Sequence, residues 1–383
     1  MHEPCRSRAA TTDFTTPNFQ ITNITIIALI MAPTTTSTWS ITGINKDGDN
    51  WDTLELKKDV PLPKLGDYDV LVQIEAVSLN FRDLAIPKGL YPFPVSFPRV
   101  PASDGAGRVL AVGPKVTHLK EGDNIATLFN QHHQSNPITP LAVKSGLGGA
   151  LDGTLRQYAV FPEHGLVKSP KTLSSVEAAT LPCAPLTAWN ALYGLQSKAL
   201  KPGDYVLTQG TGGVSLSAIQ FAVAAGATVI ATTSSAAKGE QLKKLGAHHV
   251  INYKETPNWG EVAKSLTPDN VGVDHIIEVG GPGTVAQSLK AVKLEGVISI
   301  IGFLSHGDSP KDQPTLLDAL ANICTIRGIF VGSKQQFEEM NQAIDANKIK
   351  PVVDQKIFGF EEVKDAYQYQ WEQKHFGKVV VKI

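Results

Sequence analysis

The sequence predicts an α/β protein whose second half folds as a doubly wound parallel sheet, preceded by a strand-rich domain. The first observation is the stretch YVLTQGTGGVS at residues 205–215, where a short apolar run breaks into glycines. The second is that apolar residues then recur at helical spacing and are followed by another apolar run at 228–232. The third is that helix and strand patterns alternate from there to residue 331, as parallel strands joined by helical crossovers do.

The glycine-rich stretch has the composition of a dinucleotide-binding turn. Gly210, Gly212 and Gly213 stand between the predicted strand and helix, and Ser215 takes the third glycine position of G-x-G-x-x-G. Glycine lets the backbone approach phosphates closely, and the N–H groups at a helix start favour their negative charge. A tight turn in any α/β protein is the alternative, and the flanking strands and helix argue against it. The residues predicted to contact the pyrophosphate are Gly210, Thr211, Gly212, Gly213 and Val214.

Length and composition limit the class of protein. A chain of 383 residues suggests two domains and can bury a large core. The hydrophobic fraction of 42% and charged fraction of 19% are ordinary for a soluble globular protein. The net charge of -1 argues against a dominant nucleic-acid or membrane-surface role. Cys5, Cys183 and Cys324 are too few and too scattered for a disulfide framework, which favours the cytoplasm.

The first 31 residues differ from the rest. They are rich in Thr, Ser and Asn, and the apolar run at 24–30 is too short to span a bilayer. We predict a disordered extension, with a targeting segment or an upstream start before Met31 as the open alternatives.

Short strand patterns punctuated by Pro and Gly fill the first half, and 129–151 forms a long excursion near the cleft. Strands are predicted at 40–43, 53–56, 69–79, 109–112, 124–128, 153–161 and 166–168, and one helical region from 175 to 195. In the second half, strands are predicted at 205–207, 228–232, 250–251, 273–279, 297–303 and 325–331, with helices at 238–245, 259–266, 285–292 and 316–322. The tail adds a helix, a strand at 352–357, a helix at 361–369 and a closing strand at 378–383, and we expect it to complete the first domain.

Several of these stretches together resemble the medium-chain dehydrogenase/reductase superfamily. They are VSLNFRDLAIPKGL at 77–90, PASDGAGRVLAV at 101–112, LPCAPLTAW at 181–189, the glycine turn, KLGAHHVINY at 244–253, and HFGK at 375–378. The resemblance implies a β-rich GroES-like catalytic domain at 32–195 and 345–383, and a Rossmann dinucleotide-binding domain at 196–344.

The resemblance also points to the metal-free, quinone-oxidoreductase-like subgroup. The three positions that hold zinc ligands in other members fall on Asn80, Ser103 and Cys183, and an amide, a hydroxyl and one thiol are not a zinc set. No cysteine lies between Cys5 and Cys183, so the four-cysteine structural lobe is missing. We expect no metal and interpret Cys183 as a small buried residue. His132 and His133 are adjacent histidines in a loop, expected to be solvated, with metal binding as the alternative.

The matching positions imply catalytic candidates. Asn80 and Asp83 match the Asn-x-x-Asp that faces the nicotinamide, Tyr91 matches a proton-donating tyrosine of related enoyl reductases, and Thr187 lies near the nicotinamide ring in relatives. Each has a plainer alternative: Asn80 caps a turn, Asp83 pairs with Arg82 or Arg99, and Tyr91 packs beside Pro92. Arg82 replaces small or apolar residues common at its place, which leaves substrate contacts there open.

The cofactor predicted is NADP(H). The second strand of the glycine-turn unit continues as ATTSS at 231–235, with no acid to hold a ribose or repel a phosphate. Thr232, Ser234, Ser235 and Lys238 are the predicted phosphate contacts, unless Lys238 is only a solvated first-turn residue. Gly302, Phe303 and Lys378 complete the predicted cofactor contacts.

The predicted function is NADPH-dependent hydride transfer to a quinone or an α,β-unsaturated carbonyl. Alternatives are a zinc-free alcohol dehydrogenase or biosynthetic tailoring reductase, and a non-catalytic NADPH-binding protein. The expected partner is a small-molecule substrate, with no nucleic acid and no membrane. Residues 93–97, 129–151 and 303–306 are expected to shape its pocket. A homodimer through the apolar strand at 324–331 is also expected, since this strand would otherwise be an exposed edge.

Overall fold

The computed structural model describes residues 32–46, 50–302 and 314–383. The predicted disordered extension at 1–31 and the predicted cofactor contact Phe303 lie outside these residues. Contacts group Pro33–Ile383 into one compact unit. The domain boundaries predicted within this unit therefore stay predictions.

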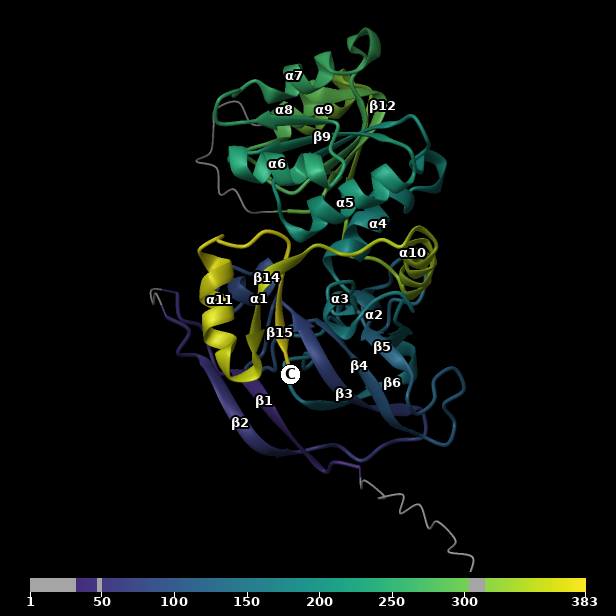
Figure 1. The fold of residues 1–383 in the computed structure, drawn as a ribbon, viewed down its shortest axis with the longest axis vertical. Coiled ribbons are helices and arrows are strands. Elements are labelled where there is room, and N and C mark those ends of the chain that lie inside the picture. Colours follow the sequence, from purple (N-terminus) through teal and green to yellow (C-terminus); the bar gives the residue numbers. More distant parts are fainter. Residues whose placement is uncertain (1–31, 47–49, 303–313) are drawn as a thin grey trace, which may run out of the picture. The chain divides into compact units, whose positions relative to one another are not determined.

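A six-stranded parallel sheet follows the glycine turn, which confirms the predicted doubly wound architecture (Figure 1). Its strands are β8 (Tyr205–Gln209), β9 (Thr228–Thr233), β10 (His249–Asn252), β11 (Val273–Glu278), β12 (Val292–Ile300) and β13 (Thr325–Gly328). The spatial order is β10-β9-β8-β11-β12-β13, and every neighbouring pair is parallel. The strand order reverses between β8 and β11, so the carboxyl ends of these two strands form the crevice where open α/β sheets bind ligands.

Helices connect these strands and cover the sheet. They are α5 (Gly213–Ala224), α6 (Ala236–Lys244), α7 (Trp259–Ser265), α8 (Val285–Ala291) and α9 (Leu316–Ala321), with short 3₁₀ turns at Gln196–Lys198 and Pro268–Asn270. The central helix α5 is apolar around most of its circumference, because it packs on β8 and β9 on one side and on α4 (Ala184–Tyr193) on the other.

The remaining strands form a mainly antiparallel seven-stranded sheet and a two-stranded sheet. The larger sheet has the order β14 (Val353–Gly359), β15 (Lys378–Lys382), β3 (Asp69–Ser78), β4 (Asp104–Val112), β5 (Asn124–Thr127) and β7 (Leu166–Lys168), while β6 (Tyr158–Pro162) also pairs with β3. The smaller sheet pairs β1 (Thr35–Ile41) with β2 (Leu54–Pro61). Figure 1 draws the yellow C-terminal strands β14 and β15 beside the blue β3, so the tail returns to the sheet built by the first half of the chain.

The remaining helices lie outside the crossovers of the parallel sheet, and two of them differ from the sequence prediction. The helices are α1 (Phe81–Ala85), α2 (Pro140–Val143), α3 (Ser175–Ala178), α4, α10 (Lys334–Asn347) and α11 (Val363–Trp371), with 3₁₀ turns at Glu163–Gly165 and Phe360–Glu362. The single helical region predicted at 175–195 is wrong, because it breaks into α3 and α4. Pro182 and Pro185 lie at the break, and proline cannot donate the backbone hydrogen bonds that would continue α3.

Across the described ranges, no helix is both long enough and apolar enough to cross a membrane.

Candidate active site

The glycine turn has the geometry that a pyrophosphate requires. Gly210 directly follows β8 and has a φ of +71°, a conformation that glycine adopts without strain. A Cβ added at Gly210 or at Gly212 would meet nothing within 4 Å, so the space beside the turn is open. The hydroxyl of Ser215 donates to the carbonyl of Gln209 at 2.6 Å, which ties the start of α5 to the end of β8. The residues present therefore fit a dinucleotide whose phosphates lie at the N-terminus of α5.

Lys378 packs directly against this turn. A Cβ added at Gly213 would lie 2.6 Å from the Lys378 Cδ and 3.0 Å from the Ala184 Cβ, so a larger residue there would displace the Lys378 side chain. The Lys378 ammonium donates to the Leu79 carbonyl at 2.7 Å and to the Asn80 Oδ1 at 2.5 Å. Lys378 thus joins the glycine turn to the start of α1. Its predicted cofactor contact stays a prediction, because these acceptors belong to the protein itself.

Asn80 and Asp83 lie together at α1, as the Asn-x-x-Asp spacing predicts. The backbone N–H of Asn80 donates to the Asp83 Oδ2 at 2.8 Å, so Asp83 closes the first turn of the helix. The Asp83 side chain is fully buried, and burial raises its pKa to about 6 although the neighbouring Arg82 opposes this shift. Asp83 lies 3.6 Å from the Arg82 Nη1, whereas Arg99 pairs with Asp152 at 3.1 Å. Of the two alternatives for Asp83, the structure therefore contains the pair with Arg82.

A second buried carboxylate, Asp104, completes a network that the sequence did not reveal. Asp104 accepts from the Ser103 hydroxyl at 2.7 Å and lies 3.5 Å from the Lys378 ammonium. Burial raises the pKa of Asp104, while Lys378 opposes the shift. Two carboxylates therefore lie near two cations, Arg82 and Lys378, which limits the cost of burying four charged groups.

The three positions that match zinc ligands make other contacts. Asn80 is bound by Lys378, its Nδ2 lies 3.5 Å from the Ser103 Oγ, and Ser103 donates to Asp104. Burial raises the pKa of the Cys183 thiol. Within the described parts of the chain, no group of three or more His, Cys, Asp or Glu side chains is arranged to hold a metal ion.

Arg82 connects Tyr91 to helix α1. Its Nε donates to the Tyr91 hydroxyl at 3.3 Å, and its Nη1 donates to the Leu147 carbonyl at 2.8 Å. The guanidinium carbon lies 5.0 Å from the Tyr91 ring centroid and 4.8 Å from that of Phe129. Leu147 and Phe129 both belong to the predicted excursion at 129–151, so this excursion reaches the candidate catalytic residues.

Aromatic side chains extend from Tyr91 to the parallel sheet. Ring centroids are 5.4 Å apart for Tyr91 and Phe93, 5.6 Å for Phe93 and Phe330, and 5.9 Å for Phe129 and Phe330. Phe330 follows β13, and no sequence pattern predicts that it meets residues 93 and 129. Sequence reasoning therefore missed this residue.

Thr187 lies in α4, where its hydroxyl donates to the Cys183 carbonyl at 2.7 Å.

The predicted ribose-phosphate contacts gather at the end of β9 and the start of α6. Thr232 is buried in β9, Ser234 follows the strand, and the Ser235 hydroxyl caps α6 by accepting from the backbone N–H of Lys238. The Lys238 ammonium donates to the carbonyls of His375 at 3.0 Å and Gln373 at 3.4 Å. Desolvation lowers the pKa of Lys238, so it is a half-buried cation rather than a freely solvated one.

A buried carboxylate, Glu278, fixes the loops at the switch point, and sequence reasoning missed it as well. Glu278 ends β11 and accepts from the Gln209 Nε2 at 2.7 Å and from the backbone of Gly280 and Gly281, each at 3.0 Å. The hydroxyls of Thr284 and Ser288 also donate to it. The signal was present in the sequence: an acid stands near the end of an apolar strand, two residues before Gly280. The predicted contact Gly302 packs nearby, since a Cβ there would lie 1.8 Å from the Val279 carbonyl oxygen.

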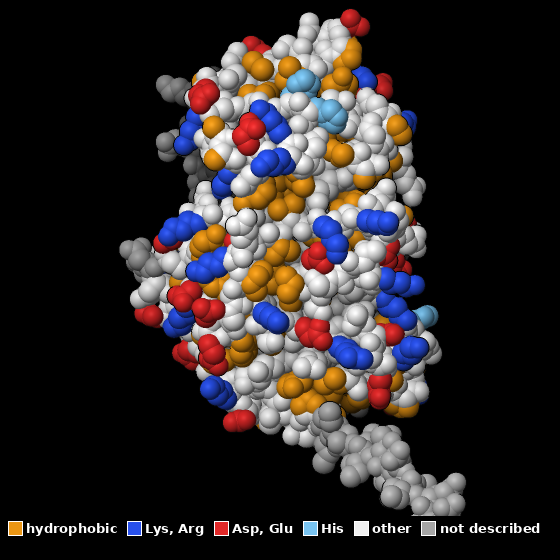
Figure 2. Space-filling view, viewed as in Figure 1, with side chains coloured by type: hydrophobic (Ala, Val, Ile, Leu, Met, Phe, Trp, Pro, Cys, Tyr) orange, Lys and Arg blue, Asp and Glu red, His pale blue; other side chains and the backbone are white. Residues whose placement is uncertain are grey.

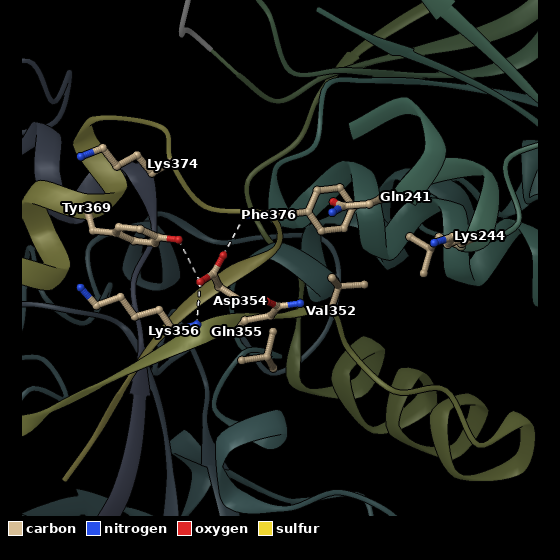
Figure 3. Close-up of a pocket in the computed structure, with 11 residues that line it drawn as sticks. Gln241, Lys244, Val352, Asp354, Gln355, Lys356, Tyr369, Lys374 and Phe376 are labelled. Carbon is tan, nitrogen blue, oxygen red and sulfur yellow. Dashed lines mark hydrogen bonds between the residues drawn. The ribbon is translucent and has the colours of Figure 1, made fainter. Parts of the chain in front are cut away.

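A separate groove of about 740 Å³ lies between α6 and the C-terminal strands and helix (Figure 3). Its buried carboxylate, Asp354, accepts from the Tyr369 hydroxyl at 3.2 Å and from the backbone N–H groups of Phe376 and Lys356, each at 2.9 Å. This groove contains none of the candidate catalytic residues, so it is not the substrate site that the sequence predicts.

Comparisons with known proteins agree with this geometry. The family described as Alcohol dehydrogenase GroES-like domain matches residues 66–171, and the family described as Zinc-binding dehydrogenase matches residues 213–346. A zinc-type alcohol dehydrogenase-like protein of Schizosaccharomyces pombe is 50% identical over 321 residues, covering 84% of this chain and 92% of that protein. The chain belongs to the medium-chain dehydrogenase/reductase superfamily.

Other members of the superfamily support the same class. The 2-methylene-furan-3-one reductase of Solanum lycopersicum is 31% identical over 356 residues, covering 92% of this chain and 80% of that protein. The crystal structure of a putative alcohol dehydrogenase from Sinorhizobium meliloti is similar with a TM-score of 0.81 and 38% identity, over 92% of this chain and 100% of that chain. The predicted superfamily and enzyme class are thus confirmed: the chain is an oxidoreductase with an NAD(P)-binding dehydrogenase fold.

Proposed function

We propose that this member of the superfamily transfers hydride from NADPH to a quinone or an α,β-unsaturated carbonyl without a metal. The proposal rests on the chemistry and contacts of Asn80, Ser103 and Cys183, the three positions that match zinc ligands. Asn80 and Ser103 are tied into the buried network of Lys378 and Asp104. A set of one amide, one hydroxyl and one thiol does not suit zinc. The reductase of Solanum lycopersicum supports the alkene as the reduced group, because its name specifies a ketone conjugated to a methylene.

The residues of the chain then divide the work. The glycine turn and the N-terminus of α5 would hold the dinucleotide, which supplies the hydride when bound. Phe93, Phe129 and Phe330 would contact a flat conjugated substrate. Tyr91 would donate the proton that the reduced substrate requires. We propose that Asn80 positions the nicotinamide and that Lys378 orients the side-chain amide of Asn80.

The test is NADPH oxidation measured on a panel of quinones and enones, combined with elemental analysis of the purified protein. We expect turnover of at least one of these substrate classes, unchanged by a chelator, with far less than about one zinc per chain. Stoichiometric zinc together with loss of activity on chelation would contradict the proposal. That result would favour the second candidate, an alcohol dehydrogenase, which the names of several relatives support. NADPH binding without any turnover would favour a non-catalytic role.

We predict that NADPH binds more tightly than NADH, and that Lys238→Ala narrows the difference. The end of β9 offers hydroxyls and no carboxylate, and the Lys238 ammonium lies at the start of α6, where it could exchange a carbonyl partner for a phosphate oxygen. Calorimetric titration of both cofactors measures the effect. Lys243→Ala is the matched control, since Lys243 is an exposed lysine of the same helix paired with Glu240. Equal affinity of the unmutated protein for both cofactors would refute this preference.

We also propose a homodimer formed through β13. This strand is the edge of the parallel sheet, and large aliphatic side chains near it are exposed: Leu294, Leu316, Leu317, Leu320, Ile323 and Ile326. Such an apolar edge favours pairing with a second copy. Sedimentation at micromolar concentration should show a dimer, and a monomer would overturn this proposal.

We propose that the other partners are small molecules and that the protein works in the cytoplasm. Positive and negative side chains alternate over the face drawn in Figure 2, with no extended patch of one sign to attract a polyanion. Cys183 and Cys324 are free thiols, which fits a reducing compartment.

A further inference from the structure

We propose that Arg82 is a positioning residue for proton transfer: it fixes the Tyr91 phenol so that its O–H is available to the substrate. This inference rests on the proposed reduction of an α,β-unsaturated carbonyl and names a further residue for that reaction. It resolves the question that the sequence left open at position 82, where an arginine stands in place of a small or apolar residue.

The hydrogen bond between Arg82 and Tyr91 can have only one direction. A guanidinium group has donors and no acceptor, so in the 3.3 Å contact the Arg82 Nε–H must donate and the Tyr91 oxygen must accept. The phenolic hydrogen is thereby directed elsewhere. Among the residues described by the structure, no acceptor takes a hydrogen bond from the Tyr91 hydroxyl, and Tyr91 is only partly buried. Its hydrogen is therefore free to bind a substrate.

Several contacts fix the Arg82 side chain. This side chain is 9% exposed, and Nη1 donates to the Leu147 carbonyl and lies 3.6 Å from Asp83. The guanidinium also lies over the rings of Tyr91 and Phe129. Gly149 leaves room for it, since a Cβ at that position would lie 2.6 Å from the Arg82 Nη2. The neighbouring Asp83 and the excursion at 129–151 thus fix the cation, and it in turn fixes the phenol.

Arg82 also stabilises the negative charge that forms on the Tyr91 oxygen during the reaction. Hydride adds to the β-carbon of the enone, the alkene electrons move toward the carbonyl, and the α-carbon takes a proton from the Tyr91 O–H. The phenol oxygen then carries a negative charge until a proton from water restores it. A cation in a poorly hydrated site stabilises that charge far more than it would in water. A quinone has no such requirement, because its reduced oxygens take protons from water.

The experiment is a double-mutant cycle of Arg82→Gln and Tyr91→Phe, measured on one enone and one quinone. We expect Arg82→Gln to lower kcat on the enone by about tenfold or more, with NADPH affinity and quinone turnover within about twofold of the unmutated protein. In the Tyr91→Phe background, Arg82→Gln should lower kcat on the enone by less than about twofold, because both residues serve the same proton transfer. Losses that multiply independently, or equal losses on enone and quinone, would overturn the inference.

Two further variants keep the test decisive if Arg82→Gln folds poorly. Arg82→Lys keeps the charge but loses the fixed fork that reaches Tyr91, so enone turnover should fall while quinone turnover persists. An unchanged enone rate in a folded Arg82→Lys protein would contradict the inference. Arg156→Gln is the matched control, since Arg156 also lies over an aromatic ring, 5.4 Å from the Phe161 centroid, and makes no contact with Tyr91. If the unmutated protein reduces neither an enone nor a quinone, the proposed function fails together with the inference. If it reduces quinones alone, or if the double-mutant cycle is additive, the inference fails and the proposed function stands.

Discussion

We expect Tyr91→Phe to lower kcat on an enone by at least tenfold. Hydride addition to the β-carbon leaves negative charge on the carbonyl and requires a proton at the α-carbon. Tyr91 holds a phenolic proton beside Arg82, and a well-placed general acid contributes on the order of 10²–10⁴-fold in rate. The substitution removes only the hydroxyl, so the packing of the ring against Phe93 is retained. NADPH affinity should therefore stay nearly constant.

Steady-state rates on an enone and on a quinone measure this effect. Quinone reduction should change much less, because water can protonate both reduced oxygens. Tyr68→Phe is a suitable control, since Tyr68 is 58% exposed and lies outside the site. If the Phe variant of Tyr91 reduces enones at the unmutated rate, solvent or another group supplies the proton, and Tyr91 is only a wall of the pocket.

The largest effect on stability is expected for Glu278→Ala. Glu278 is fully buried and accepts hydrogen bonds from the Gln209 side chain, two backbone N–H groups and two hydroxyls. Removing the carboxylate takes the shared acceptor from five buried donors. Three of them keep a second acceptor: the Gln209 amide donates to Ser288, the Gly280 N–H to the Gln209 amide, and the Thr284 hydroxyl to the Gly281 carbonyl. Each buried unsatisfied group costs about 1–3 kcal/mol, so we expect a loss of about 3–5 kcal/mol in the free energy of unfolding.

Urea unfolding of the variant and the unmutated protein gives this difference. Glu240→Gln is the control, because Glu240 is an exposed acid in a surface pair with Lys243, and its replacement should leave the free energy of unfolding nearly unchanged. The Glu278 variant should also bind NADPH more weakly, because Glu278 fixes the loop after β11 at the carboxyl edge of the sheet. A loss of stability no greater than that of Glu240→Gln would show that the network does not hold this edge.

Much of the fold follows from local patterns in the sequence. The glycine turn between an apolar run and a helical pattern has one common structural context, so β8, α5 and β9 could be predicted together. Alternating strand and helix patterns then implied the parallel sheet. The break between α3 and α4 shows the limit of such reasoning, because helical periodicity on both sides outweighed the two prolines between them.

The candidate site could be predicted only in part, because its residues meet through tertiary contacts. The resemblance supplied Asn80, Asp83 and Tyr91 from short motifs, and the structure places Asn80 and Asp83 at one helix. The link from Tyr91 to this helix is Arg82, which a motif comparison presents as an exception rather than a connector. Phe330 lies about 200 residues further along the chain than Phe129, and no periodicity relates the two. Pairings of this kind depend on how the two sheets meet.

The central claim, that on an enone the hydride goes to the alkene rather than to the carbonyl and needs no metal, is tested most directly by following the hydride. NADPH deuterated at the transferred position is incubated with the zinc-depleted protein and an enone, and the product is examined by NMR. We predict a saturated ketone with deuterium on the β-carbon, formed at the same rate with and without a chelator. An allylic alcohol with deuterium on the former carbonyl carbon, or product formation only after zinc is restored, would contradict the claim and identify an alcohol dehydrogenase.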